Sequence, residues 1–201
     1  MPAGLNGPAR ELPAPALTRP SAVLLDRDGT LNVKADEDDY VTAPDAFVLL
    51  PGAVRAVRRL NDAGIPVFVV TNQRGVARGR MTEADLDAIH AVMTRELAAG
   101  GAHVDGIYAC VHDKDACDCR KPRPGLGRRI AVDHPELDIA DAVVVGDADS
   151  DIGLAHALRC ASIRIGDRAT APPAQWEPTT WTRDVDTAVT LLLAAEARRA
   201  S

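Results

Sequence analysis

Two aspartates separated by one residue follow the first apolar run of the chain. Residues 22–25 are Ala-Val-Leu-Leu, and Asp26-Arg27-Asp28-Gly29-Thr30 comes directly after them. An apolar run of this length is typical of a buried parallel strand, whose carboxyl end is where open α/β sheets bind ligands. A tight turn there lets both carboxylates face one hard cation such as Mg²⁺. An isolated pair of this spacing is more often a solvated turn, but the preceding strand and the following Gly-Thr favour phosphoryl-transfer chemistry.

Two further apolar runs end in residues that could complete such a site. Thr71 follows the run 65–70, and Gly146-Asp147 follows the run 142–145. A doubly wound sheet brings strand ends of this kind together at one crevice. Taken alone, Thr71 could be an ordinary strand-end residue, and the acids within residues 146–151 could simply cap a helix.

Each role in the hydrolysis of a phosphate monoester then has a candidate. Asp26 would attack phosphorus to give an aspartyl-phosphate, and a Mg²⁺ shared with Asp147 would keep nucleophile and phosphate from repelling each other. Asp28 would protonate the departing alkoxide and later activate water. This role requires a pKa high enough to hold a proton, and we expect the crowded acids to raise it. Thr71 and Lys121 would hold the transferred phosphoryl oxygens.

Four soft ligands form a second candidate site. Cys110-x-His112 and Cys117-x-Cys119 lie within ten positions of the chain, which is the pattern of a closed tetrahedral Zn²⁺ site. Because protein groups fill all four positions, the zinc would be structural and would fix the loop that carries the following Arg-Lys pair. The alternative is that these cysteines form a disulfide or remain free thiols. A disulfide is disfavoured in the cytoplasm.

The spacing of apolar residues predicts strands that alternate with helices. We expect strands over residues 22–25, 65–70, 104–111, 142–145 and 161–165. We expect helices after Pro51-Gly52, over 82–97 with a Thr82–Asp85 capping pair, after Pro124, and over 149–158 and 185–199. This alternation predicts a single α/β domain with a doubly wound, Rossmann-like parallel sheet. The connections 31–50 and 112–122 are too short for a large cap.

Length and composition limit the class of protein. The 201 residues, 46% of them hydrophobic, suit one globular domain, which we place at residues 21–200. Residues 1–20 carry five prolines and are expected to form a disordered tail. A net charge of −6 and 3% aromatic residues argue against a nucleic-acid partner. No apolar run approaches the roughly 18 residues of a membrane span, so we expect no membrane partner and a cytoplasmic protein. No coiled coil or interface stripe is visible in the sequence, so we expect a monomer.

Four of these segments together resemble the motifs of the haloacid dehalogenase superfamily of phosphohydrolases. They are Asp26-Arg27-Asp28-Gly29-Thr30, Thr71-Asn72-Gln73, Lys121-Pro122 and Val145-Gly146-Asp147. The cysteine and histidine pattern before Lys121 is similar to that of two groups of Mg²⁺ phosphatases with a zinc loop. These are the D-glycero-D-manno-heptose 1,7-bisphosphate phosphatases and the bacterial histidinol-phosphatases. Residues 71–83 resemble the heptose enzymes more closely.

The resemblance implies a Mg²⁺-dependent phosphatase, with zinc as a second metal, that removes the 7-phosphate of a heptose 1,7-bisphosphate. It implies Asp26 as nucleophile, Asp28 as proton donor, and Thr71 and Lys121 as phosphoryl stabilisers. Magnesium would be held by Asp26, Asp28 and Asp147, and zinc by Cys110, His112, Cys117 and Cys119. The substrate would be bound by Arg120, Asn72, Gln73, Arg74 and Arg78, and the last two suit a second phosphate.

Two alternatives remain open. Histidinol phosphate would need the same chemistry with a cationic ligand, which the acidic residues 36–39 could suit, and the spacing of His112 and Cys117 is closer to that of the histidinol-phosphatases. A zinc-stabilised binding protein could keep the fold without turnover, because a fold alone does not give function. The chain also departs from the pattern at Ala148, where many relatives have a lysine.

Overall fold

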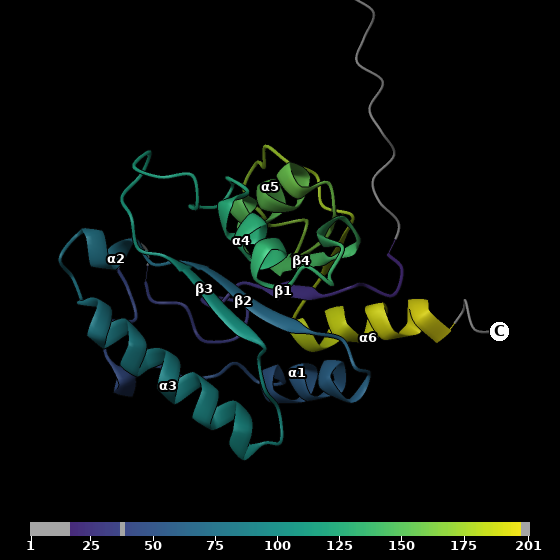
Figure 1. Cartoon of the computed structure of the whole chain (residues 1–201), viewed down its shortest axis with the longest axis horizontal. Helices are drawn as coiled ribbons and strands as arrows, with labels where there is room; N and C mark the ends of the chain where they lie inside the picture. The colour runs from purple at the N-terminus through teal and green to yellow at the C-terminus, as the bar shows by residue number, and fades with distance from the viewer. Residues whose placement is uncertain (1–16, 37–38, 198–201) are drawn as a thin grey trace, which may run out of the picture.

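The computed structural model describes residues 17–36 and 39–197. Within them, six parallel strands form one sheet with the order β3-β2-β1-β4-β5-β6 (Figure 1). The strands are β1 (Val23–Leu25), β2 (Val67–Asn72), β3 (Gly106–Cys110), β4 (Val143–Gly146), β5 (Ala161–Ile165) and β6 (Thr180–Thr182). The predicted doubly wound α/β fold is confirmed. Its strand order reverses between β1 and β4, which is where such sheets form a ligand crevice.

Helices cover both faces of the sheet. One face carries α1 (Ala53–Asp62), α3 (Glu83–Ala99) and α6 (Val185–Ala197), and the other carries α4 (Gly125–Asp133) and α5 (Asp149–Leu158) (Figure 1). In β1, Val23 and Leu25 belong to the core of the first face, whereas Leu24 belongs to the core of the second. A strand covered on both faces is apolar at every position, which explains the unbroken run in the sequence.

The helix that follows β2 begins at the predicted cap. Thr82 Oγ1 accepts a hydrogen bond from the Asp85 backbone N–H at 3.1 Å, and the Asp85 carboxylate accepts one from the Thr82 N–H at 2.8 Å. This capping box satisfies two donors that the first turn of a helix leaves open. The predicted apolar face of α3 is buried throughout, at Leu86, Ile89, Val92, Met93 and Leu97.

Two short elements were not predicted. They are α2 (Arg74–Ala77) and β6, and each is too short to show a periodic pattern. The connection 31–50 contains a 3₁₀ helix over Pro44–Ala46 and an antiparallel bridge between Asn32 and Leu49. A second bridge, between Asp28 and Asn32, places the start of this connection beside the turn that follows β1.

Residues 17–20, which precede the predicted domain boundary at residue 21, contact the rest of the described chain. Leu17 packs against the core, Pro20 is buried, and Arg19 Nη2 donates to the Ala63 carbonyl at 2.8 Å. The rest of the predicted tail lies outside the described residues, as do residues 37–38 of the acidic segment. None of the helices in the described part of the chain has the length and hydropathy needed to cross a membrane.

Candidate active site

Three acids meet at the carboxyl ends of β1 and β4. Asp26 follows β1, Asp147 follows β4, and Asp151 lies in the first turn of α5. One carboxylate oxygen of each lies within 4.8 Å of the others. The strand pairing aligns Leu25 with Val145, and the Asp26 N–H continues the ladder by donating to the Val145 carbonyl at 2.9 Å. The backbone register therefore places the acids side by side.

Gly29 allows the two strand ends to approach this closely. Its φ of +86° is in the left-handed region, and a Cβ atom at this position would lie 2.4 Å from Asp147 Oδ2. Only glycine meets both conditions without a shift of its neighbours. Gly29 is thus needed because a larger residue at this position would collide with the Asp147 carboxylate.

Lys121 places a buried cation among these acids. Its Nζ donates to Asp26 Oδ1 at 2.7 Å and to the Val70 carbonyl at 2.6 Å, and it lies 2.6 Å from Asp151 Oδ1. Burial alone would lower the pKa of Lys121, but the charges of Asp151 and Asp26 outweigh it and raise that pKa. The side chain is therefore a cation at neutral pH.

The positive charge of Lys121 does not compensate the negative charges of Asp26, Asp147 and Asp151. Burial, and after it the charge of Asp151, raises the pKa of Asp26 from 3.8 to about 6 against the opposing effect of Lys121. Burial and the charge of Asp26 also raise the pKa of Asp147. Carboxylates in this state are costly to ionise unless a further cation is present.

The donor set fits a divalent cation. Asp147 Oδ1 is buried and, among the described residues, has no hydrogen-bond partner. A hard cation with oxygen ligands would satisfy it together with Asp26. Lys34 Nζ donates to the other oxygen, Asp147 Oδ2, at 2.9 Å. The connection 31–50 thus brings a lysine to Asp147, although position 148 carries alanine.

Asp28 faces a different set of partners. Arg27 Nη2 lies 3.0 Å from both of its oxygens, Asn32 Nδ2 donates at 3.0 Å and Gln73 Nε2 at 2.8 Å. Burial alone would raise the pKa of Asp28, but these donors, Arg27 first, lower it below its usual value. Our expectation that crowded acids raise this pKa is wrong, because hydrogen-bond donors surround the carboxylate. Its carboxylate lies outside the group of Asp26, Asp147 and Asp151, so its part in a magnesium site remains a prediction.

Gln73 and Asn72, whose contact with substrate stays a prediction, both form hydrogen bonds with neighbouring site residues. Gln73 Nε2 donates to Thr71 Oγ1 at 2.7 Å as well as to Asp28, and both Gln73 and Thr71 are only 1% exposed. Asn72 makes two hydrogen bonds with the backbone of Lys121, to its carbonyl at 3.1 Å and from its N–H at 3.0 Å. These bonds connect the two predicted phosphoryl stabilisers, Thr71 and Lys121, with the predicted proton donor Asp28 through the adjacent residues Asn72 and Gln73.

Arg120 lies beside Lys121 at a basic cavity. The cavity has a volume of about 330 Å³ and is lined by Lys114, Asp115, Arg120, Lys121, Pro122 and Arg123. Arg120 Nη1 is buried and has no hydrogen-bond partner among the described residues. A donor in this state suits an anionic ligand.

Arg74 and Arg78 are both engaged by other side chains of the protein. Arg74 forms an ion pair with Asp113 of that loop, and Arg78 Nη1 donates to the Tyr40 hydroxyl at 3.4 Å. Their predicted contact with a second phosphate therefore competes with contacts that the chain itself supplies.

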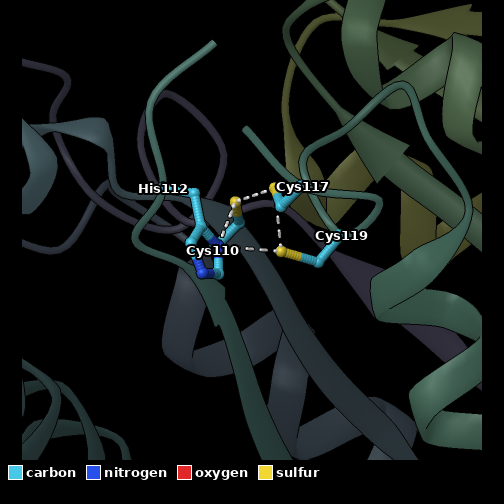
Figure 2. A group of neighbouring side chains, drawn as sticks. All are labelled: Cys110, His112, Cys117 and Cys119. Carbon is cyan, nitrogen blue, oxygen red and sulfur yellow. Dashed lines mark hydrogen bonds between the residues drawn. The ribbon is translucent and has the colours of Figure 1, made fainter. Parts of the chain in front are cut away.

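The four predicted zinc ligands converge (Figure 2). Neighbouring donor atoms are separated by 3.7 Å for Cys110 and His112, 3.5 Å for Cys110 and Cys117, and 3.2 Å for both Cys119 pairs, with His112 and Cys117. Ligands about 2.0 to 2.3 Å from a tetrahedral Zn²⁺ lie about 3.5 to 3.8 Å from one another. The two separations from Cys110 match this range, and the two from Cys119 are shorter, so the four donors converge as a zinc site requires but lie closer together on the Cys119 side. All four cysteines of the chain are free, which contradicts the disulfide alternative.

Asp151 is the main site residue that sequence reasoning did not single out. The run of acids after Gly146 offered several candidates, and the structure separates their roles. Asp149 accepts hydrogen bonds from the backbone of Gln175 and Trp176, away from the cluster. Asp151 accepts one from the Ala148 N–H at 3.0 Å and also faces Lys121. The same residue therefore caps α5 and belongs to the site.

Comparisons with known proteins agree with this geometry. The family model described as "Polynucleotide kinase 3 phosphatase" matches residues 22–176. The chain is 40% identical over 146 residues to the D-glycero-beta-D-manno-heptose-1,7-bisphosphate 7-phosphatase of Pseudomonas aeruginosa, covering 72% of this chain and 80% of that protein. It is 41% identical over 150 residues to the D-glycero-alpha-D-manno-heptose-1,7-bisphosphate 7-phosphatase of Mycobacterium tuberculosis, covering 72% and 78%.

A solved structure shares the whole fold. The D,D-heptose 1,7-bisphosphate phosphatase of B. bronchiseptica, complexed with magnesium and phosphate, aligns with a TM-score of 0.79 at 38% identity. The alignment covers 86% of this chain and 98% of that one. The chain is therefore a phosphoric monoester hydrolase that belongs to the polynucleotide kinase 3 phosphatase family, within the haloacid dehalogenase superfamily, alongside the D-glycero-D-manno-heptose 1,7-bisphosphate 7-phosphatases.

Proposed function

We propose that this enzyme removes the 7-phosphate of D-glycero-D-manno-heptose 1,7-bisphosphate in a Mg²⁺-dependent reaction. The observation that supports this substrate is the sequence identity of 40% and 41% with two heptose 1,7-bisphosphate 7-phosphatases. The chemistry is supported independently by the site, where Asp26 lies close to a buried lysine and to two further acids.

Asp26 is the proposed nucleophile. One of its oxygens forms a bond to phosphorus while the bond from phosphorus to the sugar oxygen breaks, which leaves an aspartyl-phosphate. Lys121 Nζ, 2.7 Å from Asp26 Oδ1, and the Thr71 hydroxyl are placed to hold the phosphoryl oxygens. Bound Mg²⁺, held by Asp26 and Asp147 with Asp28 and Asp151 nearby, would neutralise charge on the nucleophile and the phosphate.

Asp28 is the proposed acid and base. Its lowered pKa means that the resting enzyme carries it as a carboxylate. It must therefore gain a proton with the entering substrate before it can protonate the departing sugar oxygen. In the second step the carboxylate form takes a proton from water, whose oxygen attacks phosphorus and releases Asp26. The carboxylate form of Asp28 in the resting enzyme is thus the form that hydrolysis of the aspartyl-phosphate requires.

The loop after the cysteine cluster is proposed to recognise the rest of the substrate. Zinc bound by Cys110, His112, Cys117 and Cys119 would order this loop, which carries Arg120. The cavity that Arg120 shares with Lys114 and Arg123 is basic, so it suits a second phosphate and disfavours the cation of histidinol phosphate. This observation supports the leading proposal over the histidinol-phosphatase alternative.

Phosphate release with Mg²⁺ tests the proposal. The substrates are both anomers of the heptose 1,7-bisphosphate, histidinol phosphate, and a set of hexose monophosphates. We expect the highest kcat/KM with one heptose bisphosphate anomer and no release without Mg²⁺. Preference for histidinol phosphate, or no activity on any of these with fully zinc-loaded protein, would refute the substrate assignment.

A further inference from the structure

His90 of α3 contacts Arg27, the residue that binds the Asp28 carboxylate. Its Nε2 lies 3.3 Å from Nη1 of Arg27, a side chain that is fully buried. The other edge of the same guanidinium faces Asp28, with Nε 3.3 Å and Nη2 3.0 Å from Oδ1. Arg27 therefore connects a histidine outside all the sequence motifs to the proposed acid and base.

The direction of the contact fixes the state of the imidazole. A guanidinium has only donors, so Nε2 of His90 must accept, and its ring proton must be on Nδ1. Burial, followed by the charge of Arg27, lowers the pKa of His90 to about 4, while Asp87 and Asp28 act weakly in the opposite direction. The imidazole is thus a neutral acceptor at physiological pH, which matches the geometry.

A planar guanidinium transmits this contact to Asp28. Its nitrogens lie in one plane, so a hydrogen bond to Nη1 restricts the rotation of the edge that carries Nε and Nη2. Without an acceptor at Nη1, the buried Arg27 would have an unsatisfied donor and could tilt toward another oxygen. The Asp28 carboxylate would then keep its hydrogen bonds from Asn32 and Gln73 but lose the two-point contact with Arg27, so its orientation would be less restricted.

We propose that His90 is a positioning residue of the phosphatase reaction, and that its neutral Nε2 holds Arg27 in the orientation that aims the Asp28 carboxylate at the leaving-group oxygen. This inference rests on the proposed role of Asp28 and does not depend on which sugar phosphate is the substrate.

The test compares His90→Phe, which keeps the ring and removes the acceptor, with His90→Gln, whose amide oxygen can replace Nε2. His103→Phe, at an exposed histidine, is the matched control. Each protein is assayed on the sugar phosphate that the wild type hydrolyses fastest and on p-nitrophenyl phosphate. The aryl leaving group needs little protonation, whereas the sugar alkoxide needs the acid.

We expect kcat/KM of His90→Phe to fall about 10-fold to 100-fold on the sugar phosphate and much less on p-nitrophenyl phosphate, since misplacing a group by about 1 Å costs up to that factor. His90→Gln should recover most of the loss, and His103→Phe should match the wild type. Nitrogen NMR of the wild type should show the Nδ1–H tautomer of His90, which requires no substrate. Equal losses on both substrates, equal losses in the Phe and Gln variants, or an Nε2–H tautomer would overturn the proposal. Failure to hydrolyse the heptose bisphosphate would instead count only against the proposed substrate.

Discussion

The raised pKa of Asp26 predicts that its amide variant is more stable than the wild type. Asp26→Asn removes a charge that the folded protein holds at a pKa of about 6, compared with 3.8 in the unfolded chain. A difference of about two pKa units corresponds to about 3 kcal/mol against folding once both forms are ionised. The asparagine oxygen can still accept the hydrogen bond of Lys121, so the variant should keep its local structure.

The pH dependence of this effect has a definite sign. Between about pH 4 and pH 6 the folded wild type holds a proton on Asp26 that the unfolded chain has lost, so its stability falls as the pH rises through this window. Asp26→Asn has no such group. In Mg²⁺-free buffer at pH 7.5, the free energy of unfolding of the variant should exceed that of the wild type by up to about 3 kcal/mol, and the difference should vanish near pH 4.

Urea denaturation followed by circular dichroism at several pH values measures this difference. Asp62→Asn, at an exposed aspartate, is the control and should change stability by no more than about 0.5 kcal/mol. Turnover of Asp26→Asn should fall below detection, because the amide is not a nucleophile. A variant that is less stable than the wild type at pH 7.5, or a difference that does not change with pH, would refute the argument.

Three further substitutions test other parts of the site. Lys121→Met leaves Asp26 and Asp151 buried without their cation, so the free energy of unfolding in Mg²⁺-free buffer should fall by about 3 to 5 kcal/mol; a loss below about 1 kcal/mol in urea denaturation would contradict the buried ion pair. Cys117→Ser removes one of four zinc ligands, so elemental analysis should find less than one zinc per chain and the thermal midpoint should fall; unchanged zinc content would count against the four-ligand site. Gly29→Ala puts a Cβ atom against a carboxylate at positive φ, and should lower the free energy of unfolding by about 2 kcal/mol or more and weaken Mg²⁺ binding in calorimetry; wild-type values for both would show that the close approach is not needed.

Local sequence patterns predicted the parts of the fold that burial determines. The apolar runs became strands because a parallel sheet covered on both faces leaves no position exposed. Three strand ends carrying Asp26, Thr71 and Asp147 then had to meet, because parallel strands share a carboxyl edge. The convergence of the four proposed zinc ligands was predictable for a similar reason, since all four lie within one short loop and the end of β3.

The parts that were missed depend on contacts between distant segments. Lys34 reaches Asp147 across 113 positions, and His90 reaches Arg27 across 63. Neither residue has a local pattern that distinguishes it from a solvated lysine or a packing histidine. The pKa of Asp28 was predicted in the wrong direction for the same reason, because its donors include Gln73, 45 residues away. Spacing along the chain shows which acids meet, but it does not show which donors surround each of them.

The two candidate metal sites are joined through one pair of strands. β2 and β3 pair Asn72 with Cys110, and the Gln73 N–H donates to the Cys110 carbonyl at 2.7 Å. Cys110 is thus both a predicted zinc ligand and the backbone acceptor for the residue that bridges Thr71 and Asp28. On the same strand end, Asn72 holds the backbone of Lys121. A zinc ion that fixes Cys110 would therefore act on the position of the proposed acid as well as on the proposed phosphoryl-binding lysine, so a structural metal at this cluster would influence the chemistry without taking part in it.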